Sequence, residues 1–281
     1  MLIVDKTGTL TEGRPVFERV HAAPGFTEDE VLQSAASLDQ GSEHPLARAI
    51  VDAALARGLS LDAAEEFDAG SGIGVRGMVR RRHLALGNSA FMSDSGVDTA
   101  TMHDQANEFR RGGASVMFLA VDGALAGILA VSDPLKATSA DALRQLKDAG
   151  LRVVMATGDG RLTAQAVAAK LGIGEVYGEV KPQDKFDLVA RFQKEGAMVA
   201  MAGDGINDAP ALAKADIGIA MGTGTDVAMN SAQVTLVKGD LRGIARARRL
   251  SMATIRNMRQ NLVFAFLYNA LGVPIAAGVL Y

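Results

Sequence analysis

The first thirteen residues, Met1–Gly13, read MLIVDKTGTLTEG. The apolar run Leu2–Val4 is typical of a short buried strand, and it ends at Asp5, directly before a turn that contains glycine. An aspartate in this place can present its carboxylate to an electrophile while the amides of the turn bind phosphate oxygens. The segment therefore predicts a nucleophilic carboxylate at the end of a strand.

Four later apolar runs are each followed by turn residues, and helical stretches lie between them. The runs are Leu151–Ala156, Glu175–Val180, Met198–Ala202 and Ile217–Met221, and the helical stretches are Ser139–Ala149, Leu162–Leu171 and Lys185–Lys194. Strands that alternate with helices of this length predict an α/β fold with a parallel sheet. Because ligands bind at the carboxyl ends of such strands, we expect Asp5, Thr157 and Asp204 to converge on one site.

About a hundred residues with a different pattern separate the first strand from the others. Helical stretches at Glu28–Leu38 and Pro45–Arg57 precede strand-like runs at Glu65–Val79, His83–Gly87 and Val116–Val121. This pattern predicts an inserted α+β domain at residues 14–121. Residues 1–13 and 122–255 would then form the domain with the parallel sheet.

The composition excludes several classes of function. A net charge of −3 argues against a nucleic-acid-binding protein, which would carry a strong basic excess. The chain has no cysteine, which excludes disulfides, thiolate metal sites and cysteine nucleophiles.

The carboxy-terminal residues Asn261–Tyr281 include no charged side chain. A helix of this length would span roughly 30 Å, the thickness of a bilayer core. Six arginines precede the segment and would place the upstream protein on the cytoplasmic side: Arg242, Arg246, Arg248, Arg249, Arg256 and Arg259. We expect a transmembrane helix at 261–281, and the alternative is a buried terminal helix of a soluble protein.

Later motifs supply the groups that a phosphorylated aspartate requires. The Thr157–Asp159 segment, TGD, offers a hydroxyl and backbone amides for phosphoryl oxygens, and Lys185 offers a positive charge near the transferred group. Asp204, with Asn207 and Asp208, forms an acidic patch able to hold Mg²⁺ through hard oxygen ligands. Mg²⁺ and Lys185 would remove the repulsion between the carboxylate and the phosphate.

These motifs, DKTGT from Asp5, TGD from Thr157 and the later GDGIND, resemble the phosphorylation domain of P-type ATPases in the haloacid-dehalogenase-like superfamily. The resemblance covers nearly the whole chain. It implies that ATP phosphorylates Asp5, that Mg²⁺ is held by Asp5, the Thr7 carbonyl and Asp204, and that Asp208 supports the site.

The inserted domain indicates the subclass. Its SEHPL motif at 42–46 resembles the nucleotide-binding motif of heavy-metal (CPx-type) pumps, in which the histidine positions ATP. The GIG motif at 72–74 and the LGN motif at 86–88 also match that family, and the glycines would let the backbone approach the nucleotide phosphates. The resemblance thus implies ATP contacts from Glu43, His44, Gly72, Gly74 and Asn88.

One position departs from the family pattern. The family usually has a glutamate five residues before this histidine, for the adenine amino group, whereas this chain has Asp39. The carboxylate is kept on a stem that is one methylene shorter. Asp39 is therefore a candidate adenine contact with an altered reach.

The end of the chain indicates the transported ion. Asn261, Tyr268, Asn269 and Pro274 are spaced as in the seventh transmembrane helix of copper-transporting members. Tyr268 and Asn269 are therefore predicted ligands of copper, with silver as an alternative. Polar side chains in an apolar helix can also stabilise helix–helix contacts, which leaves a structural role open.

The resemblance as a whole implies the ATP-hydrolysing part of a copper-exporting pump in a bacterial inner membrane, with its catalytic domains in the cytoplasm. The partners would be ATP, the metal ion, the lipid membrane, and the actuator and transmembrane domains, which this chain lacks. Two alternatives to this function remain open: a pump for silver, zinc or cadmium, and a non-catalytic nucleotide-binding module. A third is a soluble phosphatase of the same superfamily, which typically carries a second aspartate where this chain has Thr7.

Overall fold

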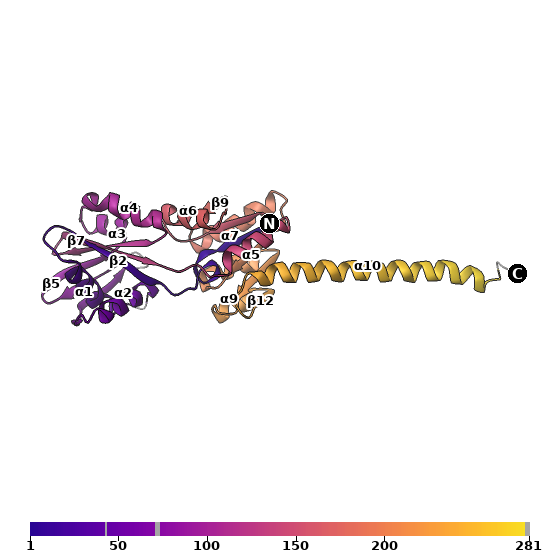
Figure 1. The fold of residues 1–281 in the computed structure, drawn as a ribbon, viewed down its shortest axis with the longest axis horizontal. Helices are drawn as coiled ribbons and strands as arrows, with labels where there is room; N and C mark the ends of the chain where they lie inside the picture. Colours follow the sequence, from indigo (N-terminus) through magenta and orange to yellow (C-terminus); the bar gives the residue numbers. More distant parts are fainter. Residues whose placement is uncertain (43, 71–73, 279–281) are drawn as a thin grey trace.

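The computed structural model describes residues 1–42, 44–70 and 74–278. Two lobes lie end to end, and one long helix projects from the second of them (Figure 1). Within the described ranges, each lobe is built around a six-stranded sheet. We call the first lobe the inserted domain and the lobe that carries the long helix the parallel-sheet domain.

The parallel-sheet domain confirms the predicted α/β fold, because all neighbouring strands of its described sheet run parallel in the order β12-β11-β10-β1-β8-β9. The strands are β1 (Leu2–Asp5), β8 (Val153–Ala156), β9 (Glu175–Tyr177), β10 (Ala200–Gly203), β11 (Ile217–Met221) and β12 (Val234–Leu236). The helices are α5 (Ser139–Asp148), α6 (Arg161–Lys170), α7 (Pro182–Lys194), α8 (Ala209–Lys214) and α9 (Asp226–Ser231). Leu2 and Val4 pack into the core on one face and Ile3 into the core on the other, so β1 is apolar throughout.

The inserted domain contains an antiparallel sheet in the order β2-β7-β6-β5-β4-β3. Its strands are β2 (Val16–Ala22), β3 (Glu65–Gly70), β4 (Gly74–Val79), β5 (Arg82–Gly87), β6 (Ser115–Val121) and β7 (Ala124–Ser132). Its α-helices are α1 (Glu28–Asp39), α2 (Pro45–Ala56), α3 (Ser89–Asp94) and α4 (His103–Gly112). α1 and α2 bury Leu32 and Ile50 in one core cluster, whereas α3 and α4 bury Met92 and Phe109 in another.

The predicted domain boundary after residue 121 is wrong. β7 pairs with β2 and β6, so the inserted domain continues to Ser132. The reason is that β6 and β7 form a hairpin whose turn lies at Asp122 and Gly123, both with positive φ angles. The turn that we read as a domain boundary is therefore a connection within one sheet.

The chain passes between the two domains twice, and Asp133 holds these two connecting segments together. Its carboxylate accepts hydrogen bonds from the Thr11 hydroxyl at 2.5 Å, the Gly13 amide at 3.2 Å and the Arg14 amide at 3.1 Å. The Glu12 amide also donates to the Pro134 carbonyl at 2.9 Å. The outgoing and returning segments are thereby fixed side by side.

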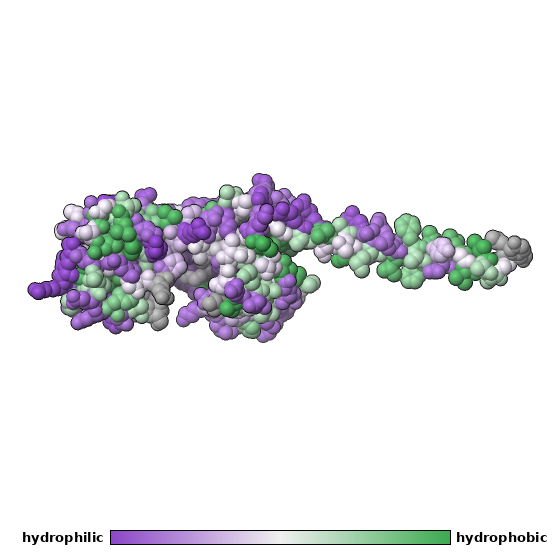
Figure 2. Space-filling model, turned by 90° about the horizontal axis from the view of Figure 1, so that it is seen from below, coloured by the Kyte–Doolittle hydropathy of each residue, from purple (hydrophilic) through white to green (hydrophobic). Residues whose placement is uncertain are grey.

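The sequence predicts a separate helix at 261–281. In the structure, the last helix, α10 (Arg242–Ala276), is continuous and already begins at Arg242. Its first turns pack on the parallel-sheet domain through Ile244 and Ala245, and the remainder extends away from it (Figure 1). Along the extended part, hydrophobic and hydrophilic residues are interspersed (Figure 2). No helix in the described ranges, α10 included, is long and apolar enough to cross a membrane.

Candidate active site

The centre of the site is a buried lysine between two buried carboxylates. The Lys185 ammonium lies 2.6 Å from Asp5 Oδ1 and 2.6 Å from Asp208 Oδ1. Asp5 ends β1 in the middle of the sheet, and Lys185 comes from α7. All three residues are at most 6% exposed, so these ion pairs are little screened by solvent.

A third carboxylate, that of Asp204, completes a candidate cation site. One carboxylate oxygen from each of Asp5, Asp204 and Asp208 can be chosen so that all lie within 4.8 Å of one another. The predicted convergence of Asp5 and Asp204 is thereby confirmed, because β1 and β10 are neighbours and end at the same edge. A cluster of carboxylate oxygens suits Mg²⁺, so these residues fit the predicted ion.

The charges in this cluster shift the pKa values of its members. Burial raises the pKa of Asp5 to about 7; Lys185 lowers it and the Asp208 carboxylate raises it further. Burial likewise raises the pKa of Asp204 to about 6, with a contribution from Asp208. Burial disfavours the charged form of Lys185, yet the two carboxylates outweigh this and raise its pKa above the ordinary value. A cation bound among the carboxylates would reduce their mutual repulsion.

The turn after Asp5 approaches Asp204 so closely that it requires glycine. Gly8 has a φ of +66°, and a Cβ added there would lie 1.6 Å from Asp204 Oδ2. The Lys136 ammonium also donates to the Gly8 carbonyl at 2.5 Å and to the Gly239 carbonyl at 3.0 Å. Thr7, the predicted carbonyl ligand, lies in this turn and is exposed. The sequence reasoning missed Lys136, although the DPLK string that follows β7 could have indicated it.

The predicted catalytic pair Thr157 and Asp159 lies at the end of β8. The Thr157 hydroxyl donates to Asp159 Oδ2 at 3.0 Å, and the Asp159 amide lies 3.2 Å from the same hydroxyl oxygen. Lys6, which the sequence reasoning also missed, pairs with Asp159 Oδ2 at 2.5 Å. Ser115 of the inserted domain donates to Asp159 Oδ1 at 3.3 Å. Asp159 therefore connects the turn after Asp5 to the other domain.

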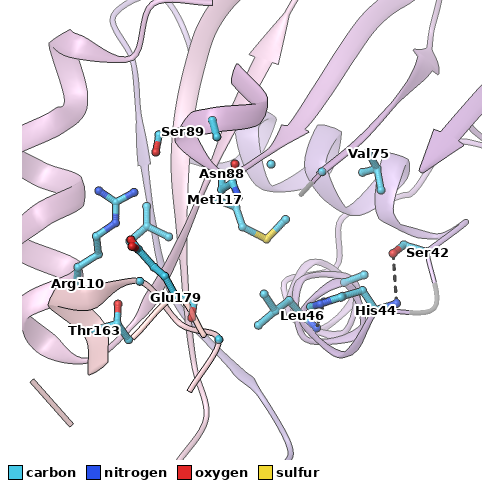
Figure 3. Close-up of a pocket in the computed structure, with 18 of the residues that line it drawn as sticks. Ser42, His44, Leu46, Val75, Asn88, Ser89, Arg110, Met117, Thr163 and Glu179 are labelled. Carbon is cyan, nitrogen blue, oxygen red and sulfur yellow. Dashed lines mark hydrogen bonds between the residues drawn. The ribbon is translucent and has the colours of Figure 1, made fainter. Parts of the chain in front are cut away.

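A pocket of about 840 Å³ lies between the two domains and is lined by both. His44, Asn88 and Gly74 line it from the inserted domain, and Gly158 and Gly160 line it from the other. Figure 3 shows His44 and Asn88 at the pocket together with Thr163 and Glu179 of the parallel-sheet domain. The predicted nucleotide contacts Glu43 and Gly72 lie outside the described residues. The volume is within the range of small-molecule sites, so a nucleotide could occupy it.

Three of the predicted contacts also have local structural roles. His44 is the N-cap of α2, where its Nδ1 accepts from the Leu46 amide at 3.2 Å, which leaves Nε2 as the donor. Asn88 is the N-cap of α3, and its Oδ1 accepts from the Phe91 amide at 2.9 Å. A Cβ on Gly74 would lie 2.4 Å from Phe91 Cδ1, so packing alone requires this glycine.

Asp39 is the least solvated of the pocket's carboxylates. It is 3% exposed, and its Oδ2 has no hydrogen-bond partner among the described residues. Burial raises its pKa to about 7. A polar ligand donor in the pocket could satisfy this oxygen.

We expect Asp39→Asn to stabilise the unliganded protein more at pH 8 than at pH 5. Because the folded-state pKa is raised, the native carboxyl keeps its proton between about pH 4 and 7 while the unfolded chain releases it. The wild-type free energy of unfolding therefore falls over this window, by up to about 4 kcal/mol, and the amide removes that loss. Thermal melts at both pH values measure the difference. The exposed Asp94→Asn is the matched control, and equal gains for Asp39→Asn at both pH values would contradict the expectation.

The predicted metal ligands Tyr268 and Asn269 lie on the extended part of α10. Tyr268 is 77% exposed, and the Asn269 side-chain amide donates to the Ala265 carbonyl at 2.9 Å within the same helix. The structure therefore does not bring them together with the other predicted site residues.

Two family models for haloacid dehalogenase-like hydrolases match this chain, over residues 1–216 and 187–247. Among curated proteins, a copper-exporting P-type ATPase of Legionella pneumophila is 56% identical, and a silver exporting P-type ATPase of Salmonella typhimurium is 52% identical. Each alignment covers 100% of this chain but only 38% and 34% of the respective relatives. The chain thus spans less than half the length of these relatives.

Solved structures of related proteins have a similar fold. A zinc-transporting PIB-type ATPase in the E2.Pi state is 36% identical, with a TM-score of 0.75 over 99% of this chain and 45% of that one. A catalytic CPx-ATPase domain, CopB-B, is 30% identical with a TM-score of 0.69, and the match covers 88% of this chain and 87% of that one.

Proposed function

The chain belongs to the haloacid dehalogenase-like hydrolases and, within them, to the CPx-type P-type ATPases, and from this premise we propose that it is the ATP-binding, aspartate-phosphorylating part of a copper-exporting pump. The observation that carries the proposal is the buried Asp5–Lys185–Asp208 cluster with Asp204 beside it. A carboxylate nucleophile next to a fixed cation and further carboxylates suits phosphoryl transfer from ATP with Mg²⁺.

In the proposed reaction, a carboxylate oxygen of Asp5 attacks the γ-phosphorus of ATP. The bond from phosphorus to the β,γ-bridging oxygen breaks, ADP leaves with that electron pair, and Asp5 becomes an acyl phosphate. Lys185 offsets the approach of two negative charges, and the Thr157 hydroxyl orients the transferred group. Asp5, Asp204, Asp208 and the Thr7 carbonyl would hold Mg²⁺, which supplies positive charge at the phosphoryl oxygens when bound.

The nucleotide would occupy the pocket between the domains. His44 offers its Nε2 hydrogen there, Asp39 offers an unsatisfied oxygen, and Asn88 and Gly74 lie on the same wall. Glu43 and Gly72 are proposed contacts by resemblance of their motifs. Support for this assignment comes from the volume of the pocket and from its position between the two domains.

The proposed function is tested by incubating the purified chain with ATP labelled in its γ-phosphate. We expect a stable acyl phosphate on the protein, because Thr7 cannot replace the second aspartate of the soluble phosphatases as an acid and base. A label that turns over rapidly would instead favour such a phosphatase. ATP binding without labelling would favour a non-catalytic nucleotide-binding module.

The transported ion and the membrane are further parts of the proposal. The relatives are named for copper, silver and zinc, and the two with the highest identity of those reported above are named for copper and silver. We therefore favour copper, with Tyr268 and Asn269 as candidate ligands, and a cytoplasmic position for both domains. The extended part of α10 would contact lipid and the other domains of the pump, since it exposes Phe264 and Phe266 at 68% and 71%.

A chain that ends at Asn257 tests the role of α10. We expect it to remain soluble and monomeric with unchanged nucleotide affinity, whereas the full chain floats with liposomes in a density gradient. The reason is that the removed residues make no contribution to the described core clusters. Unfolding of the shortened chain, or failure of the full chain to float, would contradict the membrane assignment.

A further inference from the structure

Arg110 lies in the last turn of α4, at the point where the inserted domain meets the parallel-sheet domain. The turn that follows it is fixed on α6: the Thr163 hydroxyl donates to the Ala114 carbonyl at 2.9 Å, and the Lys170 ammonium to the Gly112 carbonyl at 2.5 Å. These contacts hold Arg110 at the edge of the pocket that adjoins the parallel-sheet domain. Figure 3 shows Arg110 near Thr163 and well separated from His44.

Among the residues that the structure describes, none forms an ion pair with Arg110. Its guanidinium donates to the neutral Asn107 side chain at 3.1 Å and lies over the Phe118 ring, 5.7 Å from the centroid. In the described ranges, no carboxylate comes within 4.0 Å of it, whereas Arg161, the other arginine of the pocket, pairs with Glu179 at 3.1 Å. Arg110 is half-buried, and burial lowers its pKa. A half-buried guanidinium without a counter-charge would be stabilised by an anion bound beside it.

The proposed function determines which anion this is. If His44 and Asp39 contact the nucleoside and Asp5 attacks the γ-phosphate, then the phosphates run from the inserted domain towards the parallel-sheet domain. That path leads to the wall of the pocket lined by Arg110, Gly158 and Gly160. A planar guanidinium binds phosphate oxygens in pairs, which gives it both strength and direction.

We propose that Arg110 binds the phosphate chain of ATP and makes the pocket selective for a nucleoside triphosphate over a nucleoside. The inference rests on the proposed function and deepens it. Arg110 would contact the substrate from the inserted domain, and Asp5 is not among the residues that line this pocket, so the contribution of Arg110 is to affinity and orientation. Because its position depends on contacts with α6, this phosphate contact is complete only when the two domains are together.

Calorimetric titration of the 281-residue chain with β,γ-methylene-ATP and with adenosine tests the proposal. Arg110→Met keeps the apolar stem on Phe118 and removes the charge. We expect it to weaken binding of the triphosphate analogue by roughly tenfold or more and to leave adenosine binding unchanged. Arg110→Lys should recover part of the loss, because it restores the positive charge. Arg111→Met, at the exposed neighbouring position, should bind both ligands like the wild type.

Two results would overturn the inference alone: an unchanged affinity of Arg110→Met for the triphosphate analogue, or an equal loss for the analogue and adenosine. The second of these would assign Arg110 to the packing on Phe118, and thermal melts would show the accompanying loss of stability. If the wild-type chain bound no triphosphate, the proposed function would fail together with the inference. The two failures are therefore distinguishable.

Discussion

Asp5→Asn should abolish labelling by γ-phosphate-labelled ATP while the affinity for ATP is retained. The amide has the size and shape of the carboxylate but is a far poorer nucleophile, so we expect the rate to fall about a thousandfold or more. Binding should persist because Asp5 is not among the residues that line the nucleotide pocket, and because the loss of one negative charge reduces repulsion of the phosphates.

The measurement is acid-stable incorporation of label, with the dissociation constant of β,γ-methylene-ATP determined on the same preparation. The folded state should tolerate the change, since the substitution removes a buried carboxylate whose pKa is already raised to about 7. Asp148→Asn, at an exposed aspartate of α5, is the control and should label normally. Wild-type labelling by Asp5→Asn would refute the mechanism.

Lys185→Met should destabilise the protein by about 3–5 kcal/mol and also abolish labelling. Lys185 is the cation shared by Asp5 and Asp208, each at 2.6 Å, and its removal leaves two buried carboxylates without a counter-charge. Asp208 also accepts weak hydrogen bonds from the Asp204 and Gly205 amides, both at 3.3 Å. A shift of its carboxylate would therefore disturb the loop that carries the third acidic residue.

Chemical denaturation measures this loss, and Lys194→Met is the matched control because Lys194 is exposed at the end of the same helix. Added Mg²⁺ should stabilise Lys185→Met more than the wild type, because it would neutralise the same carboxylates. If Lys185→Met were as stable as Lys194→Met, the lysine would not be the counter-charge that holds the site together.

The sequence by itself determined the parallel-sheet domain and the position of Asp5 in it. Runs such as Leu2–Val4 are apolar at every position, as strands covered on both faces must be, and each is followed by turn residues. Since parallel strands end at a common edge, the position of Asp5 and Asp204 directly after strands was sufficient to predict their convergence.

The boundary of the inserted domain could not be predicted in the same way. The turn at Asp122 and Gly123 looks like a domain boundary in sequence, and only the pairing of β7 with β2 and β6 shows that it is a hairpin. One pairing partner of β7 is β2, which lies about a hundred residues earlier in the sequence. A pattern among neighbouring residues therefore cannot predict this pairing.

Only the tertiary structure decided which polar side chains form hydrogen bonds or ion pairs, and with which partners. Lys6 and Lys136 are ordinary lysines in the sequence, yet one pairs with Asp159 and the other joins the carbonyls of Gly8 and Gly239. Arg110 and Arg111 are likewise indistinguishable by type, but one lines the pocket and the other is exposed. The physical reason is that solvation and charge balance depend on contacts between residues distant along the chain, whereas the strand and turn patterns are set by neighbours.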